Sequence, residues 1–460
     1  MPKIVIIGAG SVMFTRQLVS ALLASPFLHD VEIVLEDING AILQRTLRLV
    51  SLMIEQTGLE ARVSATTSQR EALHGADFVI NSFQIGGLDA WNLDMDIPRK
   101  YGVIQEVGDT LGPGGIFRAL RHIPPLLSIA RDMEEICPDA LLINKANPLA
   151  PLVWATQATS IRTVGLCYGI TYTVAQLAGY LGIGPWVDHP YTPEQWAKLM
   201  YSPVPEGVEF TYAGINHMAW ILSFRYQGRD MYGAINSLPD SEKVVAADGV
   251  RCEILRHFGF WSTENHWHFT DYVPYFRKNE ATINRFLPRR WNLLELERQV
   301  HAANAAEIEE QLSGKRPVVI QPNVLVAPQI IAAMSGGPCT RVNVNLPNTG
   351  LVSNLPAECV VEVPAYIDGT GIHPLAMGPL PRQCAALCRT NIDVQGLVVE
   401  SILQQRPEAA MHALSLDPVT AAVCTLDQIR EMFDEMRLAE QRWLGEWMQP
   451  GASRQKRGQQ

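Results

Sequence analysis

The first eleven residues constrain the fold more than any other part of the chain. An apolar, β-branched run, Ile4-Val5-Ile6-Ile7, leads directly into Gly8-Ala9-Gly10-Ser11. This is typical of a buried strand that turns into a helix, where Gly8 permits the tight turn and Gly10 lets backbone N–H groups approach a dinucleotide pyrophosphate. The third glycine of the usual pattern is absent, because Met13 occupies its place. Taken alone, the pattern fits a nucleotide site or an ordinary strand-to-helix turn.

A second apolar run favours the nucleotide interpretation. Residues 31–35 read as the next strand and end at Glu36-Asp37. An acidic residue at the end of the second strand of such a fold binds a ribose hydroxyl. We expect Asp37 to have this role, with Glu36 as the alternative.

Strand-like and helix-like segments alternate from residue 1 to about 190. Apolar runs at 76–81, 140–144 and 163–167 read as strands, and 15–24, 41–56 and 116–133 have helical spacing, with Pro124-Pro125 expected to interrupt the last helix. This alternation predicts an α/β fold with a doubly wound parallel sheet, in which ligands bind at the carboxyl ends of strands. The polar stretch Asn144 to Asn147 and Cys167 lie at such ends.

The pattern changes near residues 185–205, a loop-like stretch that contains several prolines. We expect an NAD-binding domain over 1–190, an α+β domain for substrate, metal and oligomer contacts over 191–450, and a disordered tail over 451–460. In the second domain, 208–212 reads as a strand, and 292–313, 382–412 and 426–448 have helical patterns.

Composition limits the function. The chain has 460 residues, a hydrophobic fraction of 47% and a formal net charge of -10, which disfavours nucleic acid as a partner. Its eight cysteines form no CxxC pair and fit a reducing compartment, so we expect a cytoplasmic protein. Neither a signal peptide nor an apolar stretch long enough for a membrane is apparent in the sequence.

Several segments carry side chains suited to chemistry. Cys167 and His217 each follow a strand, and a thiolate and an imidazole can share a divalent metal, although either residue alone is more often part of a core. Asn147 precedes Pro148 at a strand end, and a glycine-rich loop at 109–115 leads to Arg118. The segment 263–276 is dense in aromatic, His, Asp and Tyr side chains that can move protons.

Together these motifs resemble glycoside hydrolase family 4, the NAD-dependent glycosidases, and within it most closely the α-galactosidase branch. The matching stretches follow the family order almost from end to end: 6–11, 83–87, 109–121, 137–140, 147–148, 164–167, 213–219, 268–272, 354–356 and 368–372. The resemblance implies a Rossmann-type domain like that of lactate and malate dehydrogenases. It also implies NAD and a divalent metal, typically Mn²⁺, as cofactors, and a homodimer or homotetramer.

The resemblance implies an unusual way of breaking the glycosidic bond, outside the two-carboxylate mechanisms. NAD⁺ oxidises C3 of the sugar, a base removes the acidified C2 proton, and the aglycone leaves from C1 by elimination. Water then adds, and the ketone is reduced again, so that no net redox change occurs.

The resemblance also assigns residues. Cys167 and His217 match the metal ligands, and Tyr272, with Asp271 as second choice, matches the proton-abstracting base. Three further residues fall at substrate-binding positions: Asn147, Arg118 and His268. Five fall at cofactor-binding positions: Gly8, Gly10, Ser11, Asp37 and Gln84.

Two departures from the branch leave the substrate open. Tyr168 stands where the family has a His or Asp that protonates the leaving group, and Lys145 replaces an aromatic residue. A lysine beside the sugar suggests an anionic glycoside, such as a glucuronide, galacturonide or sulfoquinovoside, as the alternative to an α-galactoside. Alternatively, Lys145 is a catalytic residue that orients the C3 hydroxyl. The sequence also leaves open an NAD-dependent sugar or 2-hydroxy-acid dehydrogenase, against which Cys167 and His217 argue, and a nucleotide-sensing protein without catalysis.

Overall fold

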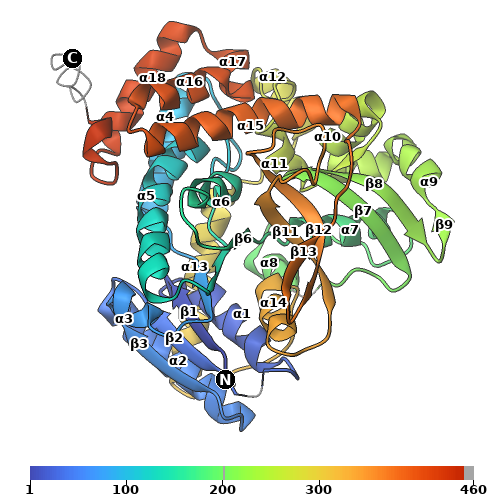
Figure 1. Ribbon diagram of the computed structural model, residues 1–460. Helices are drawn as coiled ribbons and strands as arrows, with labels where there is room; N and C mark the ends of the chain where they lie inside the picture. Colours follow the sequence, from blue (N-terminus) through green and yellow to red (C-terminus); the bar gives the residue numbers. More distant parts are fainter. Residues whose placement is uncertain (29, 200–201, 450–460) are drawn as a thin grey trace.

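The N-terminal part of the chain forms the parallel half of one large sheet. A computed structural model describes residues 1–28, 30–199 and 202–449, so the predicted tail over 451–460 lies outside the described residues (Figure 1). Six strands lie in the order β3-β2-β1-β4-β5-β6, all parallel, as in dinucleotide-binding folds. They are β1 (Lys3–Ile7), β2 (Glu32–Glu36), β3 (Arg62–Thr66), β4 (Phe78–Asn81), β5 (Leu141–Asn144) and β6 (Thr163–Gly165).

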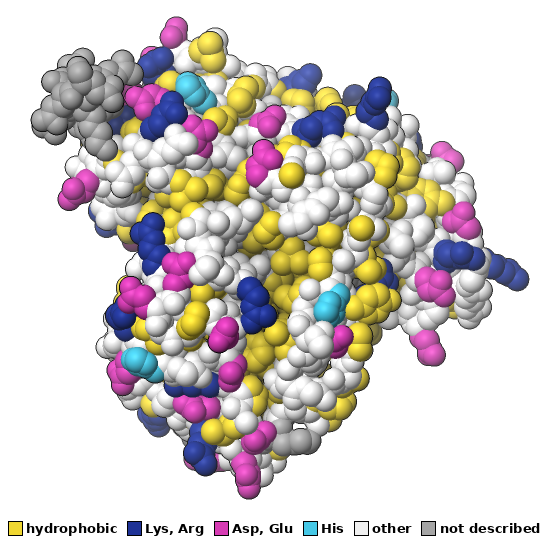
Figure 2. Space-filling view, in the orientation of Figure 1, with side chains coloured by type: hydrophobic (Ala, Val, Ile, Leu, Met, Phe, Trp, Pro, Cys, Tyr) yellow, Lys and Arg dark blue, Asp and Glu magenta, His cyan; other side chains and the backbone are white. Residues whose placement is uncertain are grey.

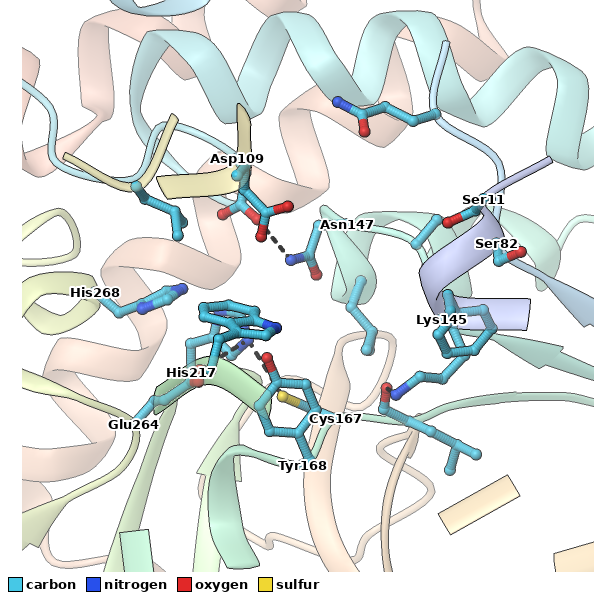
Figure 3. A pocket seen from close by; sticks show the side chains of 18 of the residues that line it. Ser11, Ser82, Asp109, Lys145, Asn147, Cys167, Tyr168, His217, Glu264 and His268 are labelled. Carbon is cyan, nitrogen blue, oxygen red and sulfur yellow. Dashed lines mark hydrogen bonds and ion pairs between the residues drawn. The ribbon is translucent and has the colours of Figure 1, made fainter. Parts of the chain in front are cut away.

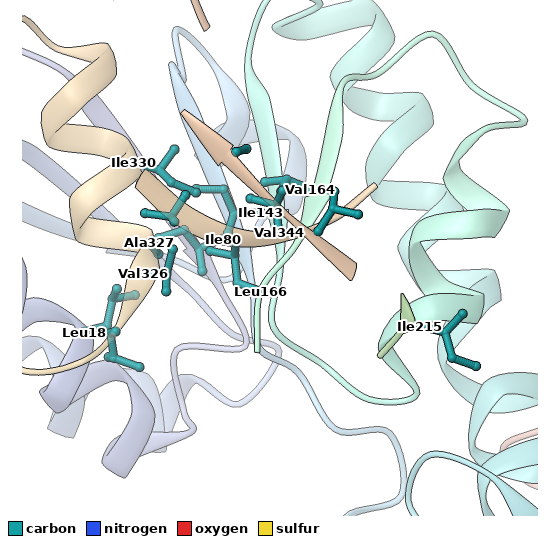
Figure 4. Packing of buried hydrophobic residues seen from close by; sticks show 14 of the residues in the cluster. Leu18, Ile80, Ile143, Val164, Leu166, Ile215, Val326, Ala327, Ile330 and Val344 are labelled. Carbon is teal, nitrogen blue, oxygen red and sulfur yellow. The ribbon is translucent and has the colours of Figure 1, made fainter. Parts of the chain in front are cut away.

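Both faces of this half are buried, which explains the nearly continuous apolar runs in its strands. In β1, Ile4 and Ile6 belong to the core on one face, and Val5 and Ile7 belong to the core on the other. Figure 4 shows part of the first core, where side chains of the helices α1 and α14 and of strands β4, β5, β6 and β11 gather.

The sheet continues without a break into an antiparallel half. β6 pairs with β11 through Gly165 and Asn345, and the order then runs β12, β7, β8 and β10, which completes a sheet of 13 strands with β9 and β13 at its sides. These strands are β7 (Val208–Ile215), β8 (Met218–Tyr226), β9 (Arg229–Asp230), β10 (Trp261–Ser262), β11 (Thr340–Pro347), β12 (Val360–Asp368) and β13 (Gly371–Pro374).

Helices cover the parallel strands and pack around the antiparallel half (Figure 1). Those of the first half are α1 (Val12–Leu23), α2 (Gly40–Thr57), α3 (Gln69–Leu73), α4 (Gly87–Lys100), α5 (Gly112–Ile136), α6 (Leu149–Thr156), α7 (Gly169–Tyr180) and α8 (Pro193–Leu199). Those that follow are α9 (Tyr232–Asn236), η1 (Leu238–Asp240), α10 (Glu242–Phe258), α11 (His266–Thr270), α12 (Glu280–Phe286), α13 (Leu293–Leu312), α14 (Val326–Met334), α15 (Arg382–Leu403), α16 (Pro407–Leu416), α17 (Pro418–Val423), α18 (Leu426–Ala439) and η2 (Glu446–Met448).

Three helix predictions are wrong in detail. Pro124 and Pro125 do not interrupt α5, since the helix runs on with most of its side chains buried, and this packing outweighs the lost backbone hydrogen bonds. The segment 382–412 is two helices, because Gln405 takes a left-handed conformation (φ 54°) and Pro407 begins α16. α18 ends at Ala439, and the next residue, Glu440, is buried in contact with Arg121.

The charge distribution on the surface and the apolar character of the helices are relevant to possible binding partners. On the face shown in Figure 2, acidic and basic side chains are interspersed, and apolar side chains form a band across the middle. In the described part of the chain, no helix combines the length and apolar character needed to cross a membrane. The division of the chain near residue 190 stays a prediction.

Candidate active site

A cavity of about 250 Å³ lies at the carboxyl ends of the parallel strands. Figure 3 shows how ten of its residues face one another, with Ser11 and Ser82 on one side and Cys167, His217 and Glu264 on the other. Nine of the residues predicted from the sequence line this cavity: Ser11, Gln84, Arg118, Lys145, Asn147, Cys167, Tyr168, His217 and His268. The fold therefore brings the predicted sugar and metal residues to one place, together with two of the five predicted cofactor residues. The other three, Gly8, Gly10 and Asp37, are not among the residues that line the cavity.

The glycine turn after β1 has no room for side chains. Gly8 has a left-handed conformation (φ 80°), and a Cβ there would lie 2.6 Å from the backbone of Phe83. A Cβ on Gly10 would lie 2.5 Å from Asp37 Oδ2, the atom that accepts a hydrogen bond of 2.8 Å from the Gly10 amide. Ser11 follows as the N-cap of α1. A turn without side chains at the N-terminus of a helix leaves its backbone N–H groups open to a dinucleotide pyrophosphate.

The structure separates the two candidate ribose ligands. Asp37 is half-buried beside the glycine turn, and Asn39 also donates its backbone amide to Asp37 Oδ1 at 2.8 Å. Glu36 is buried within the strand, where desolvation and the neighbouring Asp37 raise its pKa to about 7. A carboxyl that is kept from water is poorly placed for a ribose, so the geometry favours Asp37.

A thiol, an imidazole and a carboxylate meet at the other end of the cavity. Cys167 follows β6, His217 occupies the β7–β8 hairpin with a left-handed backbone (φ 62°), and Glu264 follows β10. The His217 Nε2 atom lies 3.3 Å from Cys167 Sγ and 3.0 Å from Glu264 Oε2, and all three residues are buried. One sulfur, one nitrogen and one oxygen donor in this arrangement fit a borderline divalent metal ion.

The charges of this cluster depend on one another. Burial opposes ionisation of Glu264, but the positive charges of His217 and His268 lower its pKa to about 2. Burial and the Glu264 charge raise the pKa of the Cys167 thiol, and Glu264 is the main group that raises the pKa of His217. A metal ion bound here would take the place of these protons on the thiol and the imidazole.

Glu264 was missed as a site residue in the sequence. It belongs to the dense 263–276 segment, but no spacing relates it to Cys167 or His217. β10 pairs with β8 so that Ser262 lies opposite Trp220, and this register carries the following residues to the hairpin of His217. Only the pairing of distant strands assembles the cluster.

Asn147 and its neighbours form the wall of the cavity between the glycine turn and the cluster of Cys167, His217 and Glu264. Asn147 Nδ2 donates to Asp109 Oδ2 at 2.8 Å, and Arg118 Nε donates to the Asn147 carbonyl at 3.3 Å. The His268 ring lies 4.7 Å from that of His217. Amide, carboxylate and imidazole groups around one cavity are suited to the hydroxyl groups of a sugar.

The two residues that depart from the family pattern lie side by side. Lys145 Nζ donates to the Leu166 carbonyl at 2.9 Å and lies 5.8 Å from the centre of the Tyr168 ring. Burial lowers the pKa of Lys145 and, with the charges of Glu264 and Cys167, raises the pKa of Tyr168 well above its usual range. The Tyr168 hydroxyl is thus a weaker acid than an ordinary tyrosine.

The two candidate bases occupy different environments, and neither is among the residues that line the cavity. The Tyr272 hydroxyl lies 2.9 Å from His217 Nδ1, directly behind the metal cluster, and burial raises the pKa of this phenol. The Asp271 carboxylate accepts backbone amides of residues 106–108 and pairs with Arg277 Nε at 2.7 Å. Asp271 is therefore tied to the loop that precedes Asp109, and Tyr272, which contacts a lining residue, is the better placed candidate.

Comparisons with known proteins agree with this arrangement. The family model "Family 4 glycosyl hydrolase" matches residues 3–183, and the model of its C-terminal domain matches residues 212–420. An alpha-galactosidase of Bacillus subtilis (strain 168) is 34% identical over 97% of this chain and 100% of its own, and one of Rhizobium meliloti (strain 1021) is 33% identical over 97% and 89%. A crystal structure of a 6-phospho-alpha-glucosidase from gut microorganisms, in complex with NAD and Mn²⁺, has a TM-score of 0.78 at 19% identity and covers 97% of this chain and 99% of that one.

Proposed function

The chain belongs to family 4 of the glycosyl hydrolases, and we propose that it hydrolyses an α-hexoside of the α-galactoside type with NAD⁺ and a divalent metal, Mn²⁺ in the first place. One observation carries the proposal: a single cavity has the end of a dinucleotide-type glycine turn on one side and a Cys–His–Glu cluster on the other. A dehydrogenase for hydroxy acids needs only the first of these features.

The residues present fit both cofactors. The bare backbone at Gly10 and the Asp37 carboxylate would hold the dinucleotide, and Cys167, His217 and Glu264 would hold the metal. When bound, NAD⁺ supplies a temporary acceptor for the hydride at C3 of the sugar, and the divalent ion supplies positive charge that polarises the sugar oxygens and acidifies neighbouring groups.

The proton transfers fall to side chains of this chain. As a phenolate, with its pKa lowered by the positive charge of a bound metal ion, Tyr272 would take the proton from C2 of the sugar, and its contact with His217 Nδ1 fixes its position. Asn147, held by Asp109, would orient a sugar hydroxyl. Tyr168 would protonate the leaving oxygen at C1, and its raised pKa makes it an inefficient acid, so substrates whose aglycone leaves easily should react fastest.

A second candidate substrate is an anionic hexoside. Arg118 lines the cavity, and its buried Nη1 has no hydrogen-bond partner among the described residues. Lys145 adds a second cation on the wall next to Tyr168. A carboxylate or sulfonate on the sugar would satisfy these donors. The carboxylates of Asp109 and Glu297 in the same cavity oppose such a ligand, which is why the neutral hexoside comes first.

The test is a panel of aryl α- and β-glycosides with neutral and anionic sugars, assayed with NAD⁺ and Mn²⁺. We expect release of the aryl group without net NADH, and incorporation of solvent deuterium at C2 of the product. Hydrolysis by protein stripped of NAD would refute the proposal, and NADH formed in proportion to a consumed free sugar would favour a dehydrogenase. Lys145→Met should reduce turnover of an anionic substrate more than that of a neutral one; equal losses would exclude the anionic alternative.

A further inference from the structure

A second group of buried donor atoms lies apart from the active-site cavity. His189, Asp248 and His266 each offer a ligand atom, and these atoms all lie within 4.8 Å of one another. His189 precedes α8, Asp248 lies at a break in α10 (φ -150°, ψ 48°), and His266 begins α11. None of the three lines the active-site cavity.

One atom of this group is buried without a partner, and two others have only each other. His266 Nε2 makes no hydrogen bond to any described residue, and His266 Nδ1 and Asp248 Oδ1 contact one another as an ion pair. His266 Nδ1 and Asp248 Oδ1 are 3.5 Å apart, and the side chains of the two residues are 7% and 0% exposed. A buried polar atom without a partner costs about 1–3 kcal/mol, so the unpaired Nε2 of His266 beside two further donor groups requires an explanation.

The surrounding contacts resemble the outer shell of a metal site. Arg251 binds Asp248 through Oδ2, so Oδ1 is the oxygen on the side of His266. The Tyr172 hydroxyl lies 2.7 Å from His189 Nδ1, so Nε2 is the ring atom that would bind an ion. Such contacts orient ligands in known metal centres. Gln176 Nε2 lies 3.2 Å from His189 Nε2 and would have to give way; it also has the Tyr172 hydroxyl at 3.2 Å as a partner.

We propose that His189, Asp248 and His266 bind a second divalent transition-metal ion, distinct from the one at Cys167 and His217. Two imidazoles and a carboxylate form a donor set that Zn²⁺ and Co²⁺ accept. His266 also lines a surface cavity of about 340 Å³, which gives an ion a route to the site. Donors around a bound ion lie roughly 3.5 Å apart when bonds are about 2.1 Å, so the group must contract slightly on binding.

The ion would have a structural effect on the active site. It would join α10, α11 and the segment before α8, and α11 lies between Glu264 and Tyr272 in the sequence. By fixing α11, the ion would stabilise the segment that carries Glu264 of the active-site metal cluster and the candidate base Tyr272.

Co²⁺ binding to the full-length apo-protein tests the proposal, with the metal content measured after gel filtration. We expect about two ions per chain for the wild type and about one for Cys167→Ala and for His266→Gln. A thiolate gives Co²⁺ a charge-transfer absorption band, which Cys167→Ala should remove and His266→Gln should keep. His257→Ala, which removes an exposed histidine of α10, is the matched control and should still bind about two ions.

A second measurement covers the case in which His266→Gln folds poorly. In the Cys167→Ala background, Co²⁺ should raise the unfolding temperature, and His189→Gln should abolish that rise. The proposal is overturned if His266→Gln binds as many ions as the wild type, or if the Cys167→Ala protein takes up no ion and gains no thermal stability. In that outcome the contact between His266 and Asp248 is a structural one that needs no metal ion.

Discussion

Replacement of Gly10 by alanine tests the cofactor site where the structure is most specific. The added Cβ would lie 2.5 Å from Asp37 Oδ2 and 3.0 Å from the Ile42 Cγ2 methyl, closer than unstrained contacts allow. The Asp37 carboxylate is the closest of these groups and ends a flexible side chain, so it is the group that must move furthest. We therefore expect Gly10→Ala to fold with Asp37 displaced from the glycine turn.

The expected loss of NAD⁺ affinity in Gly10→Ala follows from the hydrogen bonds that Asp37 would make to the cofactor. Its carboxylate would hold a ribose hydroxyl, and a hydrogen bond to a charged group contributes about 1.5–3 kcal/mol. Since about 1.4 kcal/mol corresponds to a tenfold change, NAD⁺ should bind roughly 10- to 100-fold more weakly. The loss should appear in the Kd for NAD⁺ measured by calorimetry, with a smaller effect on the unfolding temperature.

Gly40→Ala is the matched control. Gly40 begins α2 on the same side of the sheet, and a Cβ there would meet only the Thr67 methyl at 3.7 Å, an ordinary contact. It should bind NAD⁺ as the wild type does. Wild-type affinity in Gly10→Ala, or an equal loss in Gly40→Ala, would refute the assignment of Asp37 and the glycine turn.

Three further predictions concern single side chains. Glu264→Gln should weaken Mn²⁺ binding at least about tenfold, measured by calorimetry, because it removes the anionic oxygen of the cluster; unchanged affinity would exclude Glu264 as a ligand. Tyr272→Phe should lower turnover about 10²- to 10⁴-fold and abolish deuterium exchange at C2 while NAD⁺ still binds; retained exchange would exclude this base. Burial raises the pKa of Glu36 from 4.5 to about 7, so the unfolded state ionises first and the wild type loses stability as pH rises between these values. The unfolding temperature of Glu36→Gln relative to wild type should therefore rise over that interval, and a difference independent of pH would contradict the argument.

The sequence predicted the parts of the fold that local patterns control. Strands β1, β2, β4 and β5 are short apolar runs buried on both faces, and turn residues mark their ends, so their positions follow from composition. The interruption predicted at the two prolines of α5 was wrong because the helix is stabilised by burial against other elements, which local sequence does not reveal. The end of α18 was missed because no local pattern marks it; the residue that follows, Glu440, contacts Arg121, a residue far away in the sequence.

The site was only partly predictable for the same reason. Cys167 and Asn147 follow parallel strands, and the rule that ligands bind at strand ends was enough to single them out. Glu264 reaches the metal cluster only because β10 pairs with β8, which no spacing in the sequence reveals. The choice between Asp271 and Tyr272 also required the structure, since the two are adjacent and only their partners distinguish them.

The pairing of Gly165 with Asn345 limits how this molecule can be studied and altered. One sheet runs through both halves of the chain, and the seam is tight, because a Cβ on Gly165 would lie 3.1 Å from the Cβ of Asn345. A protein cut between the halves would present β6 as an open edge, with free hydrogen-bonding groups that invite aggregation. Fragments and domain exchanges between relatives should therefore fail unless they carry β6 and β11 together.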